Sequence, residues 1–270
     1  MTKSATPPSV NHRMPKGMAR VPPRAIDSIP DKGVTASAIA HASWTWGQGA
    51  YFPSNLIKTM AHCPRLAQTE VDYANAFIFD ESSQLNGVQQ AGFVDRCLKE
   101  LLINAVAANN KCRYSLEHHS FIGLLAFRAA RREHEYLDKF LHLHEFDKHP
   151  AAYTPLELSV LAFTRKLCRD PHLVSDGEFE ELARLLAAHN LKTRPDDPSF
   201  TDEANDALVR SQIVEISWLV SHFCLLTRWF TVLQVEAEDE RSEVNFLQAY
   251  RTEVAPAIIA RNNDLIGDGF

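Results

Sequence analysis

The sequence lacks the features that mark nucleic-acid-binding, membrane and secreted proteins. Acidic residues outnumber basic ones by 34 to 28, and the formal net charge of -6 argues against a broad nucleic-acid surface. No apolar run approaches the roughly 20 residues that span a bilayer, so we expect no membrane partner. The N-terminus has no apolar segment of the kind that a secretory signal carries.

The cysteines also lack a pattern that would indicate a disulfide scaffold or a zinc site. The chain has five of them, scattered and without a Cys-x-x-Cys pair. We therefore expect no metal, no other cofactor and a reducing compartment, the cytoplasm. Four lie in apolar surroundings and are most simply small core residues. The five are Cys63, Cys97, Cys112, Cys168 and Cys224.

What the sequence does contain is helical periodicity over most of its length. Hydrophobic residues make up 45% of 270, enough for a sizeable core, whereas strand-like alternation is scarce. Thr154-Pro155 and Ser175-x-x-Glu178 are typical helix starts. The pattern predicts an all-α fold. The expected helices cover about 53–62, 65–79, 88–107, 113–129, 133–143, 155–169, 175–189, 206–234 and 240–261.

The chain divides into an arm and one helical domain. Residues 1–35 are rich in proline and are expected to form an extended arm, either disordered or packed on a neighbouring subunit. Residues 36–270 form a single domain whose halves, about 50–150 and 151–240, resemble each other weakly. Glu100 and Glu215 each open an apolar helical run, but twelve residues further on the first half has Cys112 and the second has Thr227. If the halves are an internal repeat, only the first half keeps the reactive residues, because the second has a threonine in place of the cysteine.

The segment from Glu100 to His119 brings together groups that could move a proton. Cys112 directly precedes the helix expected at 113–129, where backbone N–H groups and the helix dipole would favour a thiolate. Ser115 and His119 are separated by one helical turn and share a face. Cys112 and His119 are two turns apart, so we expect them on the same face, with Glu100 closing the group from the preceding helix.

The pattern Glu-x11-Cys-x-Tyr-Ser-x3-His resembles the alkylhydroperoxidase D (AhpD)/carboxymuconolactone decarboxylase superfamily. The match includes Glu100, Cys112, Tyr114 and His119, and the recognisable part covers roughly residues 50–237. Ser115 departs from it, because the redox members have their second cysteine there. The resemblance implies an all-α, AhpD-like fold with two pseudo-repeated helical halves and a homo-oligomer.

The serine changes the chemistry that the resemblance implies. In the redox members two cysteines cycle between dithiol and disulfide while Glu and His move protons. A serine hydroxyl forms neither a sulfenic acid nor a disulfide, so a dithiol peroxidase cycle is not expected. The decarboxylase branch manages without a cysteine pair and uses acid–base chemistry. Glu100 and His119 fit that branch better.

Several candidate residues keep more than one interpretation. Ser115 is a hydroxyl without a role, a hydrogen-bond partner of His119 or the substrate, or the nucleophile of a Ser-His-Glu triad. Tyr114 and His118 are candidates for substrate binding or for positioning the other groups. Glu215 is a structural echo of Glu100 or a helix charge paired with Arg228 or His222.

We expect a cofactor-independent lyase, decarboxylase or isomerase that acts on a small aromatic-derived or lactone substrate. His119 would be the general acid/base and Glu100 its proton partner, with Cys112, Ser115 and Tyr114 positioning the substrate or donating to an oxyanion. One alternative is a thiol peroxidase that uses Cys112 alone. The other is a catalytically silent member that acts as a scaffold or ligand-binding subunit.

Overall fold

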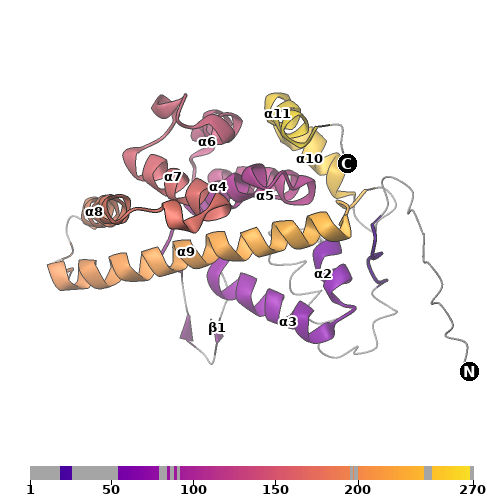
Figure 1. The fold of residues 1–270 in the computed structure, drawn as a ribbon, viewed down its shortest axis with the longest axis horizontal. Coiled ribbons are helices and arrows are strands. Elements are labelled where there is room, and N and C mark those ends of the chain that lie inside the picture. The colour runs from indigo at the N-terminus through magenta and orange to yellow at the C-terminus, as the bar shows by residue number, and fades with distance from the viewer. Residues whose placement is uncertain are drawn as a thin grey trace, which may run out of the picture.

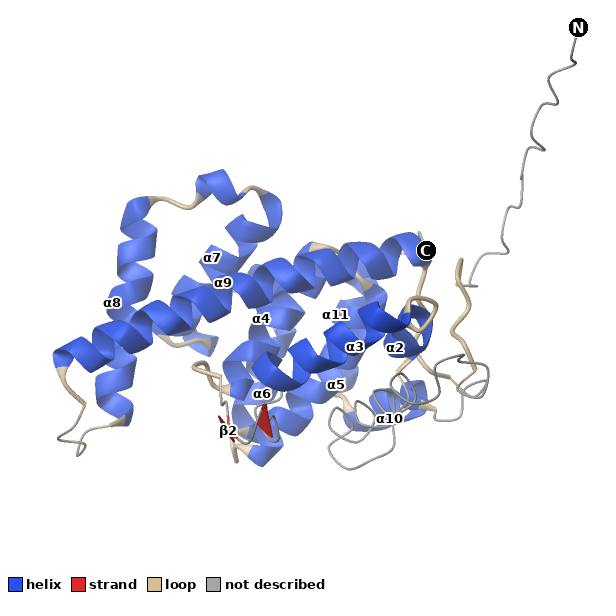
Figure 2. Cartoon of the chain, turned by 90° about the horizontal axis from the view of Figure 1, so that it is seen from below, coloured by secondary structure: helices blue, strands red, loops and turns tan. Residues whose placement is uncertain are grey.

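The computed structural model describes residues 19–25, 54–78, 84–85, 88–89, 92–194, 197, 200–239 and 245–267. The long helix α9 runs across the molecule, with α2 and α3 on one side and α4, α5 and α7 on the other (Figure 1). Helix α4 packs against α5, α7 and α9, so it lies at the centre of the core. The view from below shows α3 running alongside α9 (Figure 2).

The described elements are α-helices, with short π and 3-10 turns and one small β-ladder. They are α2 (Asn55–Met60), α3 (Pro64–Tyr73), η2 (Ala74–Ile78, a π-helix), β1 (Gln84–Leu85), β2 (Val88–Gln89), α4 (Arg96–Asn109), α5 (Arg113–Ala129), α6 (Glu133–Leu141), η3 (Leu143–Glu145), η4 (Pro150–Ala152), α7 (Pro155–Arg169), η5 (Pro171–Leu173), α8 (Asp176–Thr193), α9 (Asp202–Leu233), α10 (Phe246–Glu253) and α11 (Pro256–Ile266).

Two expected helices are wrong in part. The helix expected at 88–107 begins at Arg96, because Asp95 caps it by accepting from the backbone of Cys97 and Leu98, and β2 occupies Val88–Gln89. Strands β1 and β2 pair antiparallel on either side of Asn86-Gly87, a dipeptide typical of hairpins. The expected helix at 240–261 is two helices, α10 and α11, because Pro256 begins a new one.

Part of the N-terminal arm contacts the body of the same chain. The backbone N–H of Arg20 donates to the carbonyl of Leu233 at 2.8 Å, and that of Arg24 donates to the carbonyl of Lys58 at 3.1 Å. Residues 19–25 therefore lie along the end of α9 and against α2. The rest of the expected arm lies outside the described residues.

Helix α9 is the one described helix with the length and hydropathy of a membrane span, with a mean hydropathy of 1.3 over its most apolar window. This differs from the prediction from the sequence, in which no apolar run was long enough to span a bilayer. Of that window, 44% is buried, and the helix packs against α4, α7 and α8. Core helices of soluble proteins also pass this test of length and composition, so the test alone does not assign a membrane span to α9.

Candidate functional site

Glu100 and His119 lie in contact where α4 packs against α5. The imidazole Nδ1 of His119 is 2.8 Å from Oε2 of Glu100. The other carboxylate oxygen accepts from Nε of Arg96 at 2.9 Å and lies 2.7 Å from its Nη2, one turn earlier in α4. Glu100 is fully buried, so both of its oxygens are held by protein groups. Arg96, Glu100 and His119 form a continuous chain of charge-assisted contacts.

The Glu100 carboxylate is kept ionised by its two partners. Burial alone would raise its pKa, because a low-dielectric interior disfavours the charged form. The charges of Arg96 and His119 and their hydrogen bonds outweigh burial and leave the pKa of Glu100 below its ordinary value. An ionised carboxylate can only accept, so Nδ1 of His119 carries the proton that they share. In the neutral imidazole, Nε2 is then free to accept.

Ser115 lies one helical turn before His119 and lines the same small cavity. Its side chain is almost fully buried, and its hydroxyl has no hydrogen-bond partner among the described residues. A hydrogen bond between Ser115 and His119, part of one of the three interpretations of this residue, is therefore not formed. An unpaired buried hydroxyl costs about 1–3 kcal/mol. This orphaned hydroxyl is available to a ligand in the cavity.

We call this space the His119 cavity; it measures about 40 Å³ and has mainly apolar walls. Phe223 of α9 meets the His119 ring edge-on, with ring centroids 5.1 Å apart. The opposite wall comes from α3 and the π-helix η2. Its lining residues are Ser54, Leu56, Glu70, Ala74, Ile78, Tyr114, Ser115, His118, His119, Ile122, Phe223, Leu226 and Phe230.

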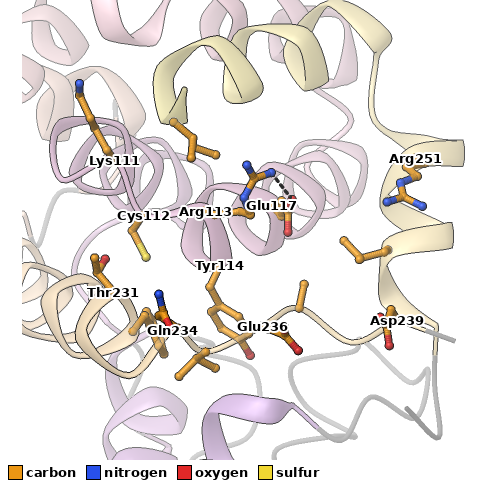
Figure 3. A pocket seen from close by; sticks show the side chains of 15 residues that line it. Lys111, Cys112, Arg113, Tyr114, Glu117, Thr231, Gln234, Glu236, Asp239 and Arg251 are labelled. Atoms are coloured by element: carbon orange, nitrogen blue, oxygen red, sulfur yellow. Dashed lines mark ion pairs between the residues drawn. The ribbon is translucent and has the colours of Figure 1, made fainter. Parts of the chain in front are cut away.

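Cys112 does not join the group around His119, and this corrects the sequence interpretation. It is the N-cap residue of α5, as expected, but its backbone is extended, with φ -91° and ψ 105°. The side chain therefore does not continue the helical face that carries Ser115 and His119. It points instead into a second cavity, on the other side of Tyr114 (Figure 3).

The expected thiolate character of Cys112 is also wrong. Burial raises the pKa of its thiol to about 11, although backbone groups of Ser115 and Tyr114 and the Thr231 hydroxyl oppose the rise. Only 2% of the residue is exposed. Desolvation outweighs the field of the helix N-terminus, so Cys112 is a protonated thiol at neutral pH.

The second space, the Cys112 cavity, has a volume of about 300 Å³ at the N-terminus of α5. Figure 3 shows Cys112, Tyr114, Thr231 and Gln234 around it, with Arg113 paired to Glu117 at 3.6 Å. Tyr114 and Phe230 line both cavities and separate them. The four expected catalytic residues therefore divide into a Glu100–His119–Ser115 group and an isolated Cys112.

His118 and Tyr114 belong to a buried network around Glu238, a residue that the sequence did not single out. Nε2 of His118 lies 2.8 Å from Oε2 of Glu238, and the Tyr114 hydroxyl donates to Oε1 at 3.2 Å. The backbone N–H of Asn55 also donates to Glu238. The network ties α2 and α5 to the segment after α9. Glu238 follows His118 by 120 residues, and no spacing rule links such distant positions.

His118 is buried, not a surface residue, and is held between two aromatic rings. Its ring stacks on Tyr114 and on Phe246, in both cases with centroids 4.0 Å apart. Its Nδ1 is 2.7 Å from the carbonyl of Tyr114. With both ring nitrogens engaged, His118 acts as a structural link beside the site.

Glu215 is a helix charge, one of its two interpretations, but it pairs with Lys99 and not with Arg228 or His222. Nζ of Lys99 lies 2.8 Å from Oε1 of Glu215, and the backbone N–H of Phe93 donates to Oε2 at 2.5 Å. His222 pairs with Glu70 at 3.0 Å instead. Glu215 thus joins α9 to α4, as a buried structural charge.

The chain is similar in fold to AhpD-like proteins of known structure. It matches an AhpD-core, peroxidase-related protein from Ralstonia eutropha JMP134 with a TM-score of 0.55 and 19% identity, over 82% of this chain and 93% of that one. A peroxidase-related protein from Silicibacter sp. TM1040 matches with a TM-score of 0.52 and 16% identity, over 82% and 91%. No protein-family model and no curated protein matches.

A third similar structure is a cysteine-to-alanine variant of the debrominase Bmp8 in complex with 2,3,4-tribromopyrrole. Its TM-score is 0.56 and its identity 18%, over 87% of this chain and 97% of that one. These likenesses confirm the all-α, AhpD-like fold that the motif predicted. The described part of the chain therefore offers an AhpD-like scaffold with an Arg96–Glu100–His119 chain ending at a small apolar cavity.

Proposed function

We propose that the protein is a cofactor-independent acid–base enzyme in which His119 moves a proton on a small, largely apolar substrate. The observation that carries the proposal is the 2.8 Å contact between Nδ1 of His119 and the buried, ionised carboxylate of Glu100. A carboxylate in this position fixes the ring and its tautomer and stabilises the imidazolium that forms when Nε2 takes a proton. Lyase, decarboxylase and isomerase reactions all need such a step.

Ser115 supplies the second element of the reaction. Its buried, unpartnered hydroxyl lies in the wall of the His119 cavity, so an oxygen that gains negative charge there would receive its hydrogen bond. A donor that is already in place and desolvated stabilises a developing oxyanion by about 3–4 kcal/mol. Ser115 as a nucleophile has less support, because no hydrogen bond links its hydroxyl to His119 in the structure.

The substrate class follows from the walls of the His119 cavity. Aromatic and aliphatic side chains surround the imidazole, which favours a flat apolar molecule with one polar group. The tribromopyrrole in the debrominase complex supports a small aromatic ring in this scaffold. The π-helix η2 forms part of the cavity wall, and π-helices are frequent at functional sites.

A single-cysteine peroxidase at Cys112 is disfavoured. The thiol has a pKa of about 11 and lies in a different cavity from His119. Position 115, where the redox members carry the cysteine nearer the histidine, is a serine. If the wild-type chain consumes peroxide, Cys112→Ser should leave that rate unchanged. Loss of peroxide consumption in Cys112→Ser would restore the peroxidase assignment.

The test is a turnover screen with a matched pair of histidine variants. The wild-type chain is incubated with a panel of small aromatic and lactone carboxylic acids, and substrate loss is followed by absorbance and mass spectrometry. We expect His119→Gln to lower kcat/KM by about 10²–10⁴-fold, the usual contribution of a general acid/base.

His189→Gln is the control, because it removes an exposed histidine of α8 that lines neither cavity. It should retain most of the activity, and circular dichroism should show both variants folded. Full activity in a folded His119→Gln variant would overturn the proposal.

A further inference from the structure

Two cysteines outside both cavities lie close enough to react with each other. Cys168, near the end of α7, and Cys224, in the middle of α9, have their sulfur atoms 3.4 Å apart, and both are free thiols. We propose that Cys168 and Cys224 form a dithiol that hydroperoxides oxidise to an intrachain disulfide joining α7 to α9. A disulfide needs a sulfur–sulfur distance of about 2.05 Å, so the two atoms must approach by a little over 1 Å.

Arg228 already holds the two backbones in register. Its Nη1 donates to the carbonyl of Cys224 at 2.8 Å, and its Nη2 donates to the carbonyl of Cys168 at 3.4 Å. One guanidinium therefore bridges the residues that must be joined. Because α7 and α9 are also packed directly on each other, closure requires small side-chain rotations and no rearrangement of helices.

The surroundings activate Cys224 and no other buried cysteine in the described chain. The thiol of Cys168, as donor, lowers the pKa of Cys224; burial opposes this, and Arg228 and Asn110 add to the lowering. Burial instead raises the pKa of Cys97 and of Cys112 to about 11. Since the thiolate is the nucleophile, Cys224 is the sulfur that attacks and Cys168 the one that resolves.

A small oxidant can reach the pair. Cys168 and Cys224 are 6% and 7% exposed, so neither is sealed in the deep core. Arg228, whose guanidinium lies against both residues, is itself exposed at the surface. The pair therefore lies beside a surface side chain, where hydrogen peroxide has easier access than a bulky alkylating reagent.

The reaction balances with one hydroperoxide per disulfide. The thiolate of Cys224 attacks the terminal peroxide oxygen, the O–O bond breaks, and an alcohol (or water) leaves after taking a proton. The sulfur of Cys168 then attacks the sulfenic acid on Cys224, the S–S bond forms, and water leaves with the Cys168 proton. Two thiols have been oxidised by two electrons and the peroxide reduced by two.

The experiment maps the first disulfide that forms in the full chain. A Cys63→Ser background removes the exposed thiol and with it the route to intermolecular pairs. This protein is titrated with hydrogen peroxide, the remaining thiols are alkylated in denaturant, and the digest is analysed by mass spectrometry. Cys97→Ser, another buried thiol, is the matched control, and Cys168→Ser with dimedone traps the attacking sulfur.

We expect a Cys168–Cys224 cross-linked peptide as the first disulfide, reversed by dithiothreitol and unchanged in Cys97→Ser. In Cys168→Ser the dimedone adduct should fall on Cys224. A first disulfide between other cysteines overturns the proposal. So does full alkylation of Cys168 and Cys224 after the remaining thiols are oxidised. Whether this disulfide forms does not depend on whether His119 is catalytic, so the two proposals can fail separately.

Discussion

At the scale of single residues, Glu100 decides how the site behaves with pH. Its folded-state pKa is lowered, so it contributes stability above its unfolded pKa of about 4.3, and that contribution is lost as the pH falls towards the folded value. We expect the free energy of unfolding of the wild type to fall as the pH drops below about 5.

The variant Glu100→Gln should weaken this pH dependence. It should also lower the free energy of unfolding at pH 7 by about 3–5 kcal/mol, because the ion pair between Arg96 and the fully buried Glu100 carboxylate is lost. Urea denaturation at pH 7 and pH 4 measures both effects. Glu180→Gln, an exposed change on α8, is the control and should keep the wild-type slope. An unchanged slope in Glu100→Gln would contradict the charge assignment.

The positions of site residues inside a helix could be predicted from the sequence, whereas the position of the residue before the helix could not. Ser115 and His119 are inside α5, and one turn places both at the same cavity, as the spacing predicts. Cys112 was assigned to that face by counting two turns, but it is the extended cap residue. Its predecessor, Lys111, has a φ of 51°, so the chain reverses direction immediately before the helix. Burial, which sets the pKa of Cys112, depends on the whole fold.

At the scale of helices, the pair Lys99–Glu215 joins the two most central elements, α4 and α9. Lys99 is fully buried in α4, and its Nζ also donates to the carbonyl of Phe77 at 2.6 Å. Lys99→Met should lower the free energy of unfolding by about 3–5 kcal/mol, since it leaves Glu215 as an unbalanced buried charge.

A double-mutant cycle separates the pair from other effects. Lys99→Met with Glu215→Gln should be less destabilised than the sum of the single variants, because the second change removes the charge that the first one exposes. Urea unfolding of the four proteins gives the coupling energy, which we expect to exceed 1 kcal/mol. Strict additivity would show that the two side chains do not act together.

The helix boundaries show which sequence signals were sufficient. The expected helices at 113–129 and 155–169 match α5 and α7, and α7 carries the capping box of Thr154 and Glu157. The helix start predicted at residue 88 is wrong because the apolar residues that follow were given more weight than Asn86-Gly87. That dipeptide is typical of a hairpin turn, and β1 and β2 pair on either side of it. The break before α11 also has a local cause, because Pro256 begins a new helix. The helical periodicity continues across this position, so one helix was predicted where there are two.

At the scale of the whole molecule, α9 carries an apolar stripe on its outer face. Val214, Trp218, Leu225 and Val232 are between 55% and 69% exposed and follow one another at spacings of four, seven and seven residues. That spacing keeps them on one side of the helix. Because exposed apolar residues in a row favour association, we propose that α9 mediates a homo-oligomer.

A charge in the stripe should dissociate the assembly. Trp218→Glu is expected to yield monomers in analytical ultracentrifugation at micromolar concentration, where the wild type sediments as an oligomer. Leu173→Glu, an equally exposed leucine on η5, should not change the sedimentation coefficient. A wild-type chain that is monomeric throughout the concentration range would contradict this role of α9.

The central claim, that Glu100 orients His119 with a free Nε2, is tested most directly by nitrogen NMR of the imidazole. Uniformly ¹⁵N-labelled chain is recorded at a pH high enough for neutral histidine, with His119→Gln to assign its signals. The account predicts a protonated Nδ1 and an unprotonated Nε2, and a loss of that preference in Glu100→Gln. A His119 ring protonated at Nε2 in the wild type would contradict it.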